Sequence, residues 1–325
     1  MTLPQAPMRP VVDGRADFGT YAGACETTSL SSLPVNRLRK LVQEKGWQWF
    51  CAIDEEFAVG GAVVDAGLAN NAFVWILDRE RKRLILDESR LLPPTTVQRA
   101  DRPAERPRVG ASFRDVTLAA TEKDAGFIVA GQFGPVTLDL TLSHAGAGPV
   151  TAICPVDEGR HPGVNVTQKS TCLSATGAVD WHGRTHTFDG ADGMLDFTHG
   201  VLARETRWRW AIGTGTTDDG TPIGFNLVDG FNSGLENALW IGDERRAVGD
   251  ASFTYDRYHP ESSWAVETDD GVVDVELDPE AVRSEDLNLG VVVSRYAQPL
   301  GRWRGTVGDH DVELVGVAES HHAKW

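Results

Sequence analysis

The sequence has few cysteines and no long apolar runs. Its four cysteines, Cys25, Cys51, Cys154 and Cys172, are widely spaced, and no two form a Cys-x-x-Cys pair. This spacing favours free thiols over disulfides or a zinc site. No apolar stretch approaches the roughly 18–20 residues that a membrane-spanning helix needs, so we expect a soluble chain. Residues 1–7 lack the basic segment and apolar core of a signal peptide, which predicts a cytoplasmic location.

Positive charge and cofactor motifs are scarce as well. The 325 residues include 31 Lys and Arg against 47 Asp and Glu, a formal net charge of −16. A surface this acidic repels phosphate backbones, which argues against non-specific nucleic-acid binding. The sequence has no P-loop, no nucleophile elbow and no HExxH motif, and His182 and His186 are too few to hold a metal. We therefore expect neither a cofactor nor a metal.

What the sequence does contain is short alternating runs separated by turns. After one short helical pattern over residues 35–45, runs of 5–8 residues alternate between apolar and polar side chains and are broken by Gly, Asp and Asn. The chain has 34 glycines and 10 tryptophans, and no segment after residue 46 has a long amphipathic helical pattern. These features predict an all-β protein with many turns.

The sequence also repeats itself at about half its length. A series of Trp-x-Trp, a glycine-containing run ending in Asp, and Asn-Ala followed by Trp-Ile occurs in Trp47–Asp78 and again in Trp208–Asp243. The offset between the copies drifts from 161 to 165 residues. This repeat predicts two related antiparallel β-domains, residues 1–200 and 201–325, each curled into a barrel. Either barrel, or the cleft between them, could hold a small ligand.

Several motifs in the second half resemble those of a known family. They lie in Asp196–Gly200, Arg204–Ala211, Ile223–Leu227, Glu236–Trp240 and Glu319–Trp325. Together they resemble the family called domain of unknown function 2804, over most of residues 47–325. That family is similar to two-domain lipocalin-like proteins, which include carotenoid hydratases and tocopherol-cyclase-like enzymes. The resemblance implies tandem calycin-type barrels and acid-catalysed chemistry on apolar isoprenoid or polyketide substrates.

Two acid-and-histidine pairs occur at equivalent ends of the repeats. Asp196 and His199 end the first half, and Glu319 and His322 end the second. A carboxylate that orients an imidazole can make a general acid or base near neutral pH. The alternative is a buried carboxylate–histidine hydrogen bond that closes each barrel, because duplicated positions can preserve architecture instead of activity.

Glu236 is a third acidic candidate. It stands where the first copy has Asn70, close to several tryptophans, and burial there would raise its pKa as a general acid requires. The alternative is an ion pair between Glu236 and Arg204, which precedes the second Trp-x-Trp.

The candidate substrate-binding residues are mostly aromatic or amide side chains. Trp208 and Trp210 share one face of a strand and could form an aromatic wall that stabilises a cation, or could simply fill a core. The remaining candidates are Arg204, Asn226, Asn237 and Trp240.

These residues predict a cofactor-independent enzyme that acts on a hydrophobic or amphipathic small molecule. The reaction would be a proton-initiated hydration, cyclisation or isomerisation, with Asp196, His199, Glu236 and His322 handling protons. One alternative is a non-catalytic lipid- or metabolite-binding protein of calycin type. Another is a glycosidase-like hydrolase that uses Asp196 and Glu236 as paired carboxylates. An apolar wall beside a desolvated acid would favour the first function, a cavity without convergent acids the second, and an open polar groove the third.

Overall fold

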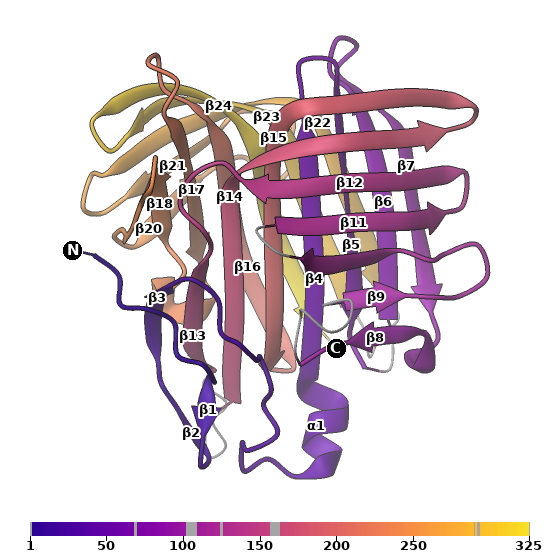
Figure 1. The fold of residues 1–325 in the computed structure, drawn as a ribbon, viewed down its shortest axis with the longest axis vertical. Coiled ribbons are helices and arrows are strands. Elements are labelled where there is room, and N and C mark those ends of the chain that lie inside the picture. Colours follow the sequence, from indigo (N-terminus) through magenta and orange to yellow (C-terminus); the bar gives the residue numbers. More distant parts are fainter. Residues whose placement is uncertain are drawn as a thin grey trace.

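The protein is built almost entirely of antiparallel β-strands (Figure 1). The computed structural model describes residues 2–67, 70–101, 109–123, 126–156, 163–288, 290 and 293–324. Within these ranges one α-helix occurs, α1 (Arg37–Gln43), in the segment with the helical pattern. Two short 3-10 turns, η1 (Pro94–Thr96) and η2 (Asn232–Gly234), interrupt the strands. The predicted all-β architecture, with antiparallel strands in two large sheets, is confirmed.

The first large sheet is formed by strands that precede residue 202. Among the described residues it has 13 strands, in the order β7-β6-β5-β4-β15-β14-β12-β11-β10-β9-β8, with β13 paired to β14 and β3 paired to β13. Its strands are β3 (Gly19–Ala22), β4 (Glu44–Ile53), β5 (Phe57–Asp65), β6 (Asn70–Asp78), β7 (Arg83–Leu92), β8 (Val97–Arg99), β9 (Val109–Ala111), β10 (Ala119–Lys123), β11 (Gly126–Phe133), β12 (Val136–His144), β13 (Val150–Val156), β14 (Gly163–Trp181) and β15 (Arg184–Val201). A separate hairpin pairs β1 (Val11–Val12) with β2 (Arg15–Ala16).

This first sheet curls over itself. In Figure 1 the strands β9, β11 and β12 cross in front of β4, β5 and β6. Apolar side chains from both layers, among them Val74, Phe127 and Leu140, form one buried core. Apolar and polar residues alternate in the sequence of Val136–His144, and buried and exposed residues alternate along β12. This pattern is expected for a strand with one buried and one solvent-exposed face.

The second large sheet begins at residue 205. Its described strands run in the order β19-β18-β17-β16-β24-β23-β22-β21-β20. They are β16 (Glu205–Thr216), β17 (Pro222–Asp229), β18 (Ala238–Ile241), β19 (Glu244–Ala247), β20 (Ala251–Thr254), β21 (Trp264–Thr268), β22 (Val273–Asn288), β23 (Val293–Val307) and β24 (His310–Lys324). Phe225, Trp264 and Trp303 lie at the centre of its core.

The two sheets have matching topology around their longest strands. In each, the strand that carries Trp-x-Trp pairs with the last strand of the sheet, β4 with β15 and β16 with β24. Trp49 lies opposite Asp196, and Trp210 lies opposite Glu319. A duplication gives such matching, and we propose residues 1–200 and 201–325 as its two domains.

One detail of the repeat is shifted in the structure. Asp65 lies opposite Gly46, whereas Asp229 lies opposite Arg209, two residues beyond the counterpart of Gly46. The match between Asp65 and Asp229 in the sequence is therefore displaced by two ladder positions. The tryptophans and the acids opposite them are the parts of the repeat that coincide.

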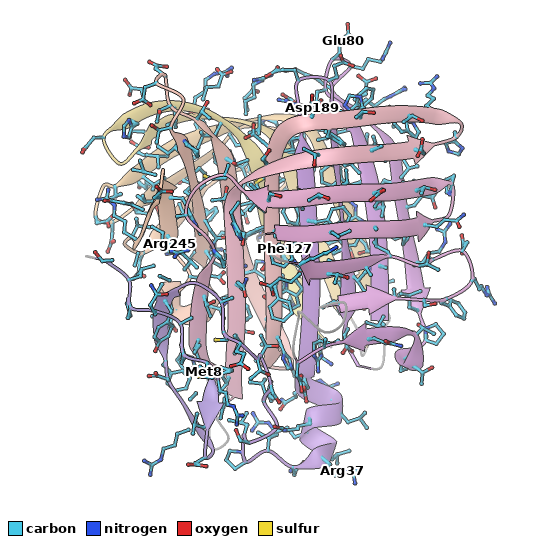
Figure 2. All side chains as sticks on the ribbon, viewed as in Figure 1. Met8, Arg37, Glu80, Phe127, Asp189 and Arg245 are labelled. Atoms are coloured by element: carbon cyan, nitrogen blue, oxygen red, sulfur yellow. The ribbon has the colours of Figure 1, made fainter. Side chains whose placement is uncertain are left out.

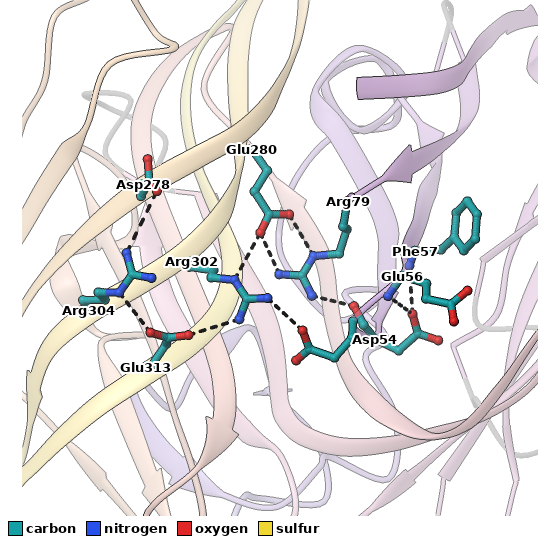
Figure 3. A network of polar contacts seen from close by, with 10 residues as sticks. Asp54, Glu56, Phe57, Arg79, Asp278, Glu280, Arg302, Arg304 and Glu313 are labelled. Carbon is teal, nitrogen blue, oxygen red and sulfur yellow. Dashed lines mark hydrogen bonds and ion pairs between the residues drawn. The ribbon is translucent and has the colours of Figure 1, made fainter. Parts of the chain in front are cut away.

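Apolar and ionic contacts join the sheets. A cluster of buried residues combines Trp49 and Met194 from the first sheet with Trp210 and Val317 from the second. Figure 3 shows an ionic network at the interface. The Arg79 guanidinium donates two hydrogen bonds to the Glu280 carboxylate across the interface, at 2.8 and 2.7 Å. These contacts fix how the two sheets face each other, and so fix any site between them.

The structure also bears on the expectations about the cysteines and about membrane-spanning helices. Cys25, Cys51, Cys154 and Cys172 are all buried, and none of them forms a disulfide in the described part of the chain, as their spacing predicts. Within the described ranges, no helix combines the length and the apolar character needed to cross a membrane.

Candidate functional site

A cavity of about 470 Å³ lies between the two sheets. Both sheets contribute to its wall, which is mostly apolar and rich in aromatic rings. Six of the aromatic residues are Trp47, Trp49, Phe73, Trp208, Trp210 and Phe231. The polar lining includes Lys169, Asp196, Glu236, Tyr296, Glu319 and His321. An apolar pocket with a few converging polar groups is the usual form of a small-molecule site.

The two Trp-x-Trp motifs meet in this cavity. The rings of Trp47 and Trp208 stack with their centroids 6.2 Å apart, and Trp49 meets Trp210 edge to face at 5.2 Å. Alternate residues of a strand share a face, so each motif directs both of its indoles toward the other sheet. The repeated motif thus builds the contact between the sheets as well as the aromatic wall.

Asp196, Lys169 and Glu236 form a buried cluster at the cavity, which we call the lysine cluster. The Lys169 ammonium donates to Asp196 Oδ1 at 2.7 Å and lies 3.4 Å from Glu236 Oε2. The Trp47 indole N–H donates to Asp196 Oδ2 at 3.2 Å, and Lys169 lies over the Trp210 ring at 5.3 Å from its centroid. One ammonium therefore holds two carboxyl groups beside the aromatic wall.

The positions of these three side chains follow from the strands and one turn. Lys169 on β14 lies opposite Asp196 on β15. Glu236 follows η2, where the Asn232 side chain donates to Glu236 Oε2 at 3.0 Å. Asn165 in turn donates to Asn232 at 2.8 Å. The turn is thus held to β14 by a chain of amide side chains, which places Glu236 next to Lys169.

The electrostatics of the lysine cluster favour one bound proton. Burial raises the pKa of Glu236, against the opposing effect of Lys169. Burial also opposes the charge of Lys169, but Asp196 and Glu236 outweigh it and raise the Lys169 pKa. Of the two carboxyl groups, Asp196 makes the shorter contact to Lys169. The shift of Glu236 favours its protonated form, because two buried carboxylates facing one ammonium would leave a net negative charge.

Glu319, Gln298 and His321 form the corresponding group in the second sheet, which we call the glutamine cluster. Glu319 accepts from the Trp208 indole at 2.9 Å and from the Gln298 amide at 2.6 Å. His321 Nδ1 lies 3.4 Å from Glu319, and His321 Nε2 lies 3.2 Å from Ser294 Oγ. With the proton on Nδ1 toward Glu319, Nε2 accepts from the Ser294 hydroxyl.

The two histidines that the sequence singled out pair with other acids than expected. His199 Nε2 lies 2.9 Å from Glu44, and His322 Nε2 lies 2.9 Å from Glu205. Residues three apart in a strand point to opposite faces, so neither histidine can pair with the acid three residues before it. The predicted pairs Asp196–His199 and Glu319–His322 are therefore wrong. Neither histidine is among the cavity-lining residues, and the acids that they contact stand at the starts of β4 and β16.

The other predicted residues divide between the cavity wall and its support. Asp196, Glu236, Arg204, Trp208 and Trp210 line the cavity. The alternative partner for Glu236 was Arg204, but the ammonium within ion-pair distance is that of Lys169.

Asn226, Asn237 and Trp240 are not among the residues that line the cavity. Asn226 accepts from the Trp210 indole at 2.8 Å and donates to the Glu236 carbonyl at 2.9 Å, so it positions both residues. The Asn237 side chain accepts a hydrogen bond from the Val228 N–H and donates one to the Gly249 carbonyl. Trp240 is buried in a separate apolar cluster and donates to the Gly148 carbonyl. Direct substrate contact by these three residues is therefore not supported.

Sequence reasoning missed Lys169, His321, Gln298 and Tyr296. Lys169 had one available signal: it is one of six lysines in the chain and stands in a strand of buried residues. His321 had another, because it follows Glu319 by two residues and so shares its face of the strand. The last residue of the closing motif, Trp325, lies outside the described residues.

Comparisons with known proteins match the chain to a family and to a fold. The family model described as Domain of unknown function (DUF2804) matches residues 11–325. A protein assigned as AttH from Nitrosomonas europaea aligns with a TM-score of 0.54 and 12% identity, over 86% of this chain and 92% of that chain. CghA aligns with a TM-score of 0.53 and 12% identity, over 99% and 98%.

A third solved structure, kievitone hydratase from Nectria haematococca, aligns with a TM-score of 0.48 and 15% identity, over 93% of this chain and 97% of that chain. At these identities, the similarity to AttH and CghA is one of fold. The comparison with curated proteins finds no match.

Proposed function

The chain belongs to the DUF2804 family, and we propose that it is a cofactor-independent enzyme that starts a hydration, cyclisation or isomerisation by protonating an apolar small molecule. The observation that carries the proposal is Glu236, a buried carboxyl group in an aromatic cavity, beside an ammonium that already neutralises Asp196. A general acid in such a setting holds its proton at neutral pH.

The proposed first step transfers the proton of Glu236 to a carbon–carbon double bond or carbonyl oxygen of the substrate. The lysine cluster changes from neutral to a net charge of −1 as the substrate gains a positive charge. This change favours the charged intermediate in a cavity with a mostly apolar wall. The faces of Trp208 and Trp210 add a cation–π contribution.

The glutamine cluster supports a second step at the same cavity. His321 can take a proton from a neighbouring carbon, which completes an isomerisation or cyclisation, or from a water molecule that adds to the cation, which completes a hydration. Glu319 orients the imidazole through its Nδ1. One cluster then supplies a proton and the other accepts one, so the net reaction consumes no acid.

The alternative functions have less support. A carrier protein does not need two carboxyl groups and an ammonium in its binding cavity, since burying them is costly. A glycosidase could use Asp196 and Glu236, whose nearest oxygens can be no more than about 6 Å apart through Lys169. However, sugar hydroxyls need a polar groove, and this wall is mainly tryptophan, phenylalanine and aliphatic side chains.

The substitution Glu236→Gln tests the proposal without a known substrate. The infrared difference spectrum between wild type and Glu236→Gln should contain the carbonyl stretch of a protonated carboxylic acid at neutral pH. Because the amide replaces a neutral acid of the same shape, the melting temperature should change little. Native mass spectrometry of protein from its own host, to detect a retained ligand, then supplies a substrate for assay. Turnover should fall about 10²- to 10⁴-fold.

The opposite result has a clear signature. If Glu236 is ionised and only pairs with Lys169, the protonated-acid band will be absent and the substitution will cost roughly 3–5 kcal/mol. Asn232→Ala is the matched control, because it removes a hydrogen bond to Glu236 and leaves the carboxyl group in place.

A further inference from the structure

One end of the molecule carries exposed leucines around an opening of the cavity. Leu38 and Leu41 on α1 are 72% and 58% exposed, and Leu91 at the end of β7 is 62% exposed. Figure 2 labels Arg37 of α1 at this end and Glu80 and Asp189 at the opposite end. Leu91 also lines the cavity, so the cavity reaches the surface beside it.

The fold does not require these leucines. Helix α1 buries none of its residues, and its first turn is held by the Asn36 side chain, which accepts from the Arg39 N–H at 2.8 Å. Val42, the residue after Leu41, lines the cavity together with Leu91. Isolated exposed leucines are ordinary on protein surfaces, but here they border the mouth of an apolar cavity.

Helix α1 differs in charge from the rest of the protein. Its seven residues include three Lys and Arg and no Asp or Glu, whereas the whole chain has 31 Lys and Arg against 47 Asp and Glu. Arg37, Arg39 and Lys40 lie between and beside the two leucines of α1. Glu44, the acidic residue that follows α1, forms an ion pair with Arg99, so the charge carried by the helix itself is positive.

We propose that the α1 face, formed by Leu38, Leu41, Leu91 and the basic residues of α1, docks on an anionic lipid bilayer. Leucines that enter the interface beside basic residues that attract anionic headgroups are the combination that binds peripheral proteins to membranes. Docking in this way turns the mouth of the cavity toward the lipid, so an apolar molecule reaches the cavity without crossing water. The inference uses the apolar cavity but not the reaction, and it is tested without measuring turnover.

Co-sedimentation of the full chain with vesicles tests the proposal. The wild type should bind phosphatidylcholine vesicles that contain phosphatidylglycerol, bind pure phosphatidylcholine vesicles much more weakly, and lose binding as salt is raised. The double substitution Leu38→Ser with Leu41→Ser should lower the partition coefficient at least about tenfold. Arg37→Glu should lower it and weaken its salt dependence.

Tyr258→Ser is the matched control. Tyr258 is 71% exposed but lies between β20 and β21 and does not line the cavity. Its substitution should leave vesicle binding unchanged. All these side chains are exposed, so the melting temperatures of the variants should equal that of the wild type, which separates lost docking from lost folding.

Three results would overturn the proposal. One is wild-type protein that does not sediment with anionic vesicles. A second is equal binding by the wild type and the double variant, or equal binding to neutral and anionic vesicles. The third is a wild type that is dimeric without binding vesicles and becomes monomeric in the double variant, which would make the α1 face a contact between two copies of the chain.

Discussion

The lysine cluster and the glutamine cluster occupy matching places in the two sheets but have different partners. Asp196 and Glu319 each lie opposite the second tryptophan of a Trp-x-Trp motif and each accept from the indole of the first. On the neighbouring strand, the first cluster has the cation Lys169 where the second has the amide Gln298. The Trp-x-Trp motif and the acid opposite it occur in both sheets, but the side chain that contacts this acid from the neighbouring strand differs.

In the proposed function, this difference lets one cavity hold a proton donor and a proton acceptor. Lys169 contacts both Asp196 and Glu236, which the turn after η2 adds to the first cluster, and burial raises the pKa of Glu236. The second cluster has an uncharged amide and the imidazole of His321, whose outer nitrogen faces Ser294. Under this proposal the two clusters differ in role because their partners differ, while the strands that carry them match.

The largest expected effect comes from making the first cluster resemble the second. Lys169→Gln removes the cation and leaves two buried acids, so it should cost roughly 3–5 kcal/mol at pH 7 and lower the melting temperature by about 10 °C. The loss should shrink as the pH falls, because the carboxyl groups take up protons. The titration of the Lys169 ammonium itself has no effect below pH 10.5. Its folded-state pKa is raised, so the stability that its charge contributes is lost only above that pH.

Thermal denaturation across pH measures this effect. Gln298→Met is the matched control in the glutamine cluster, because it removes a neutral partner from Glu319 and should cost only about 1–2 kcal/mol. Equal losses in the two variants would show that the cation does not distinguish the clusters.

The next largest effect concerns His199, which is buried and lies 2.9 Å from Glu44. Burial, followed by the charge of Arg99, lowers the pKa of His199, so the folded state favours the neutral ring. Its stabilising contribution is therefore complete above pH 6.5 and is lost as the pH falls through the folded-state pKa. His199→Gln should cost about 1–3 kcal/mol at pH 8 and less at pH 5.5. Urea denaturation at both values checks this, and a cost independent of pH would contradict it.

Repeats and residue types in the sequence predicted the sheets, the aromatic wall and two acids of the cavity. Trp208 and Trp210 were placed on one strand face from alternation alone, and Glu236 was distinguished because it replaced Asn70 beside several tryptophans. The shared face of the two tryptophans follows from the period of two of a strand, which local sequence reveals. Glu236 lies outside the strands, and its residue type alone distinguished it.

The contacts that complete the clusters depend on pairing across long separations. Lys169 meets Glu236 although 67 residues separate them, and His199 meets Glu44 across 155 residues. No local pattern reports which strands become neighbours or in what register. The pairing of Asp196 with His199, by contrast, was an avoidable error, since positions three apart in a strand face opposite sides.

A smaller effect is expected at the indoles. Trp208→Phe removes the donor 2.9 Å from Glu319 and leaves that acid with no full positive charge beside it, so it should cost about 1 kcal/mol. Trp47→Phe should cost about half as much, because Asp196 keeps the Lys169 ammonium and its indole contact is longer, at 3.2 Å. Denaturant titration of both variants compares the clusters directly. The reverse order would mean that ring stacking, and not the hydrogen bond, sets the cost.

The smallest effect should come from His322, the counterpart of His199. Its partner Glu205 is largely in solvent, and exposed ion pairs contribute little because water and salt screen them. His322→Gln should therefore leave the melting temperature within about 1 °C of wild type at both pH 8 and pH 5.5. His322 does not line the cavity, so turnover of a ligand recovered from the native protein should also be unchanged. A loss of stability equal to that of His199→Gln would show that ladder position, and not burial, gives the pair its energy. A loss of turnover with normal stability would instead return His322 to the proton-transfer residues that the sequence suggested.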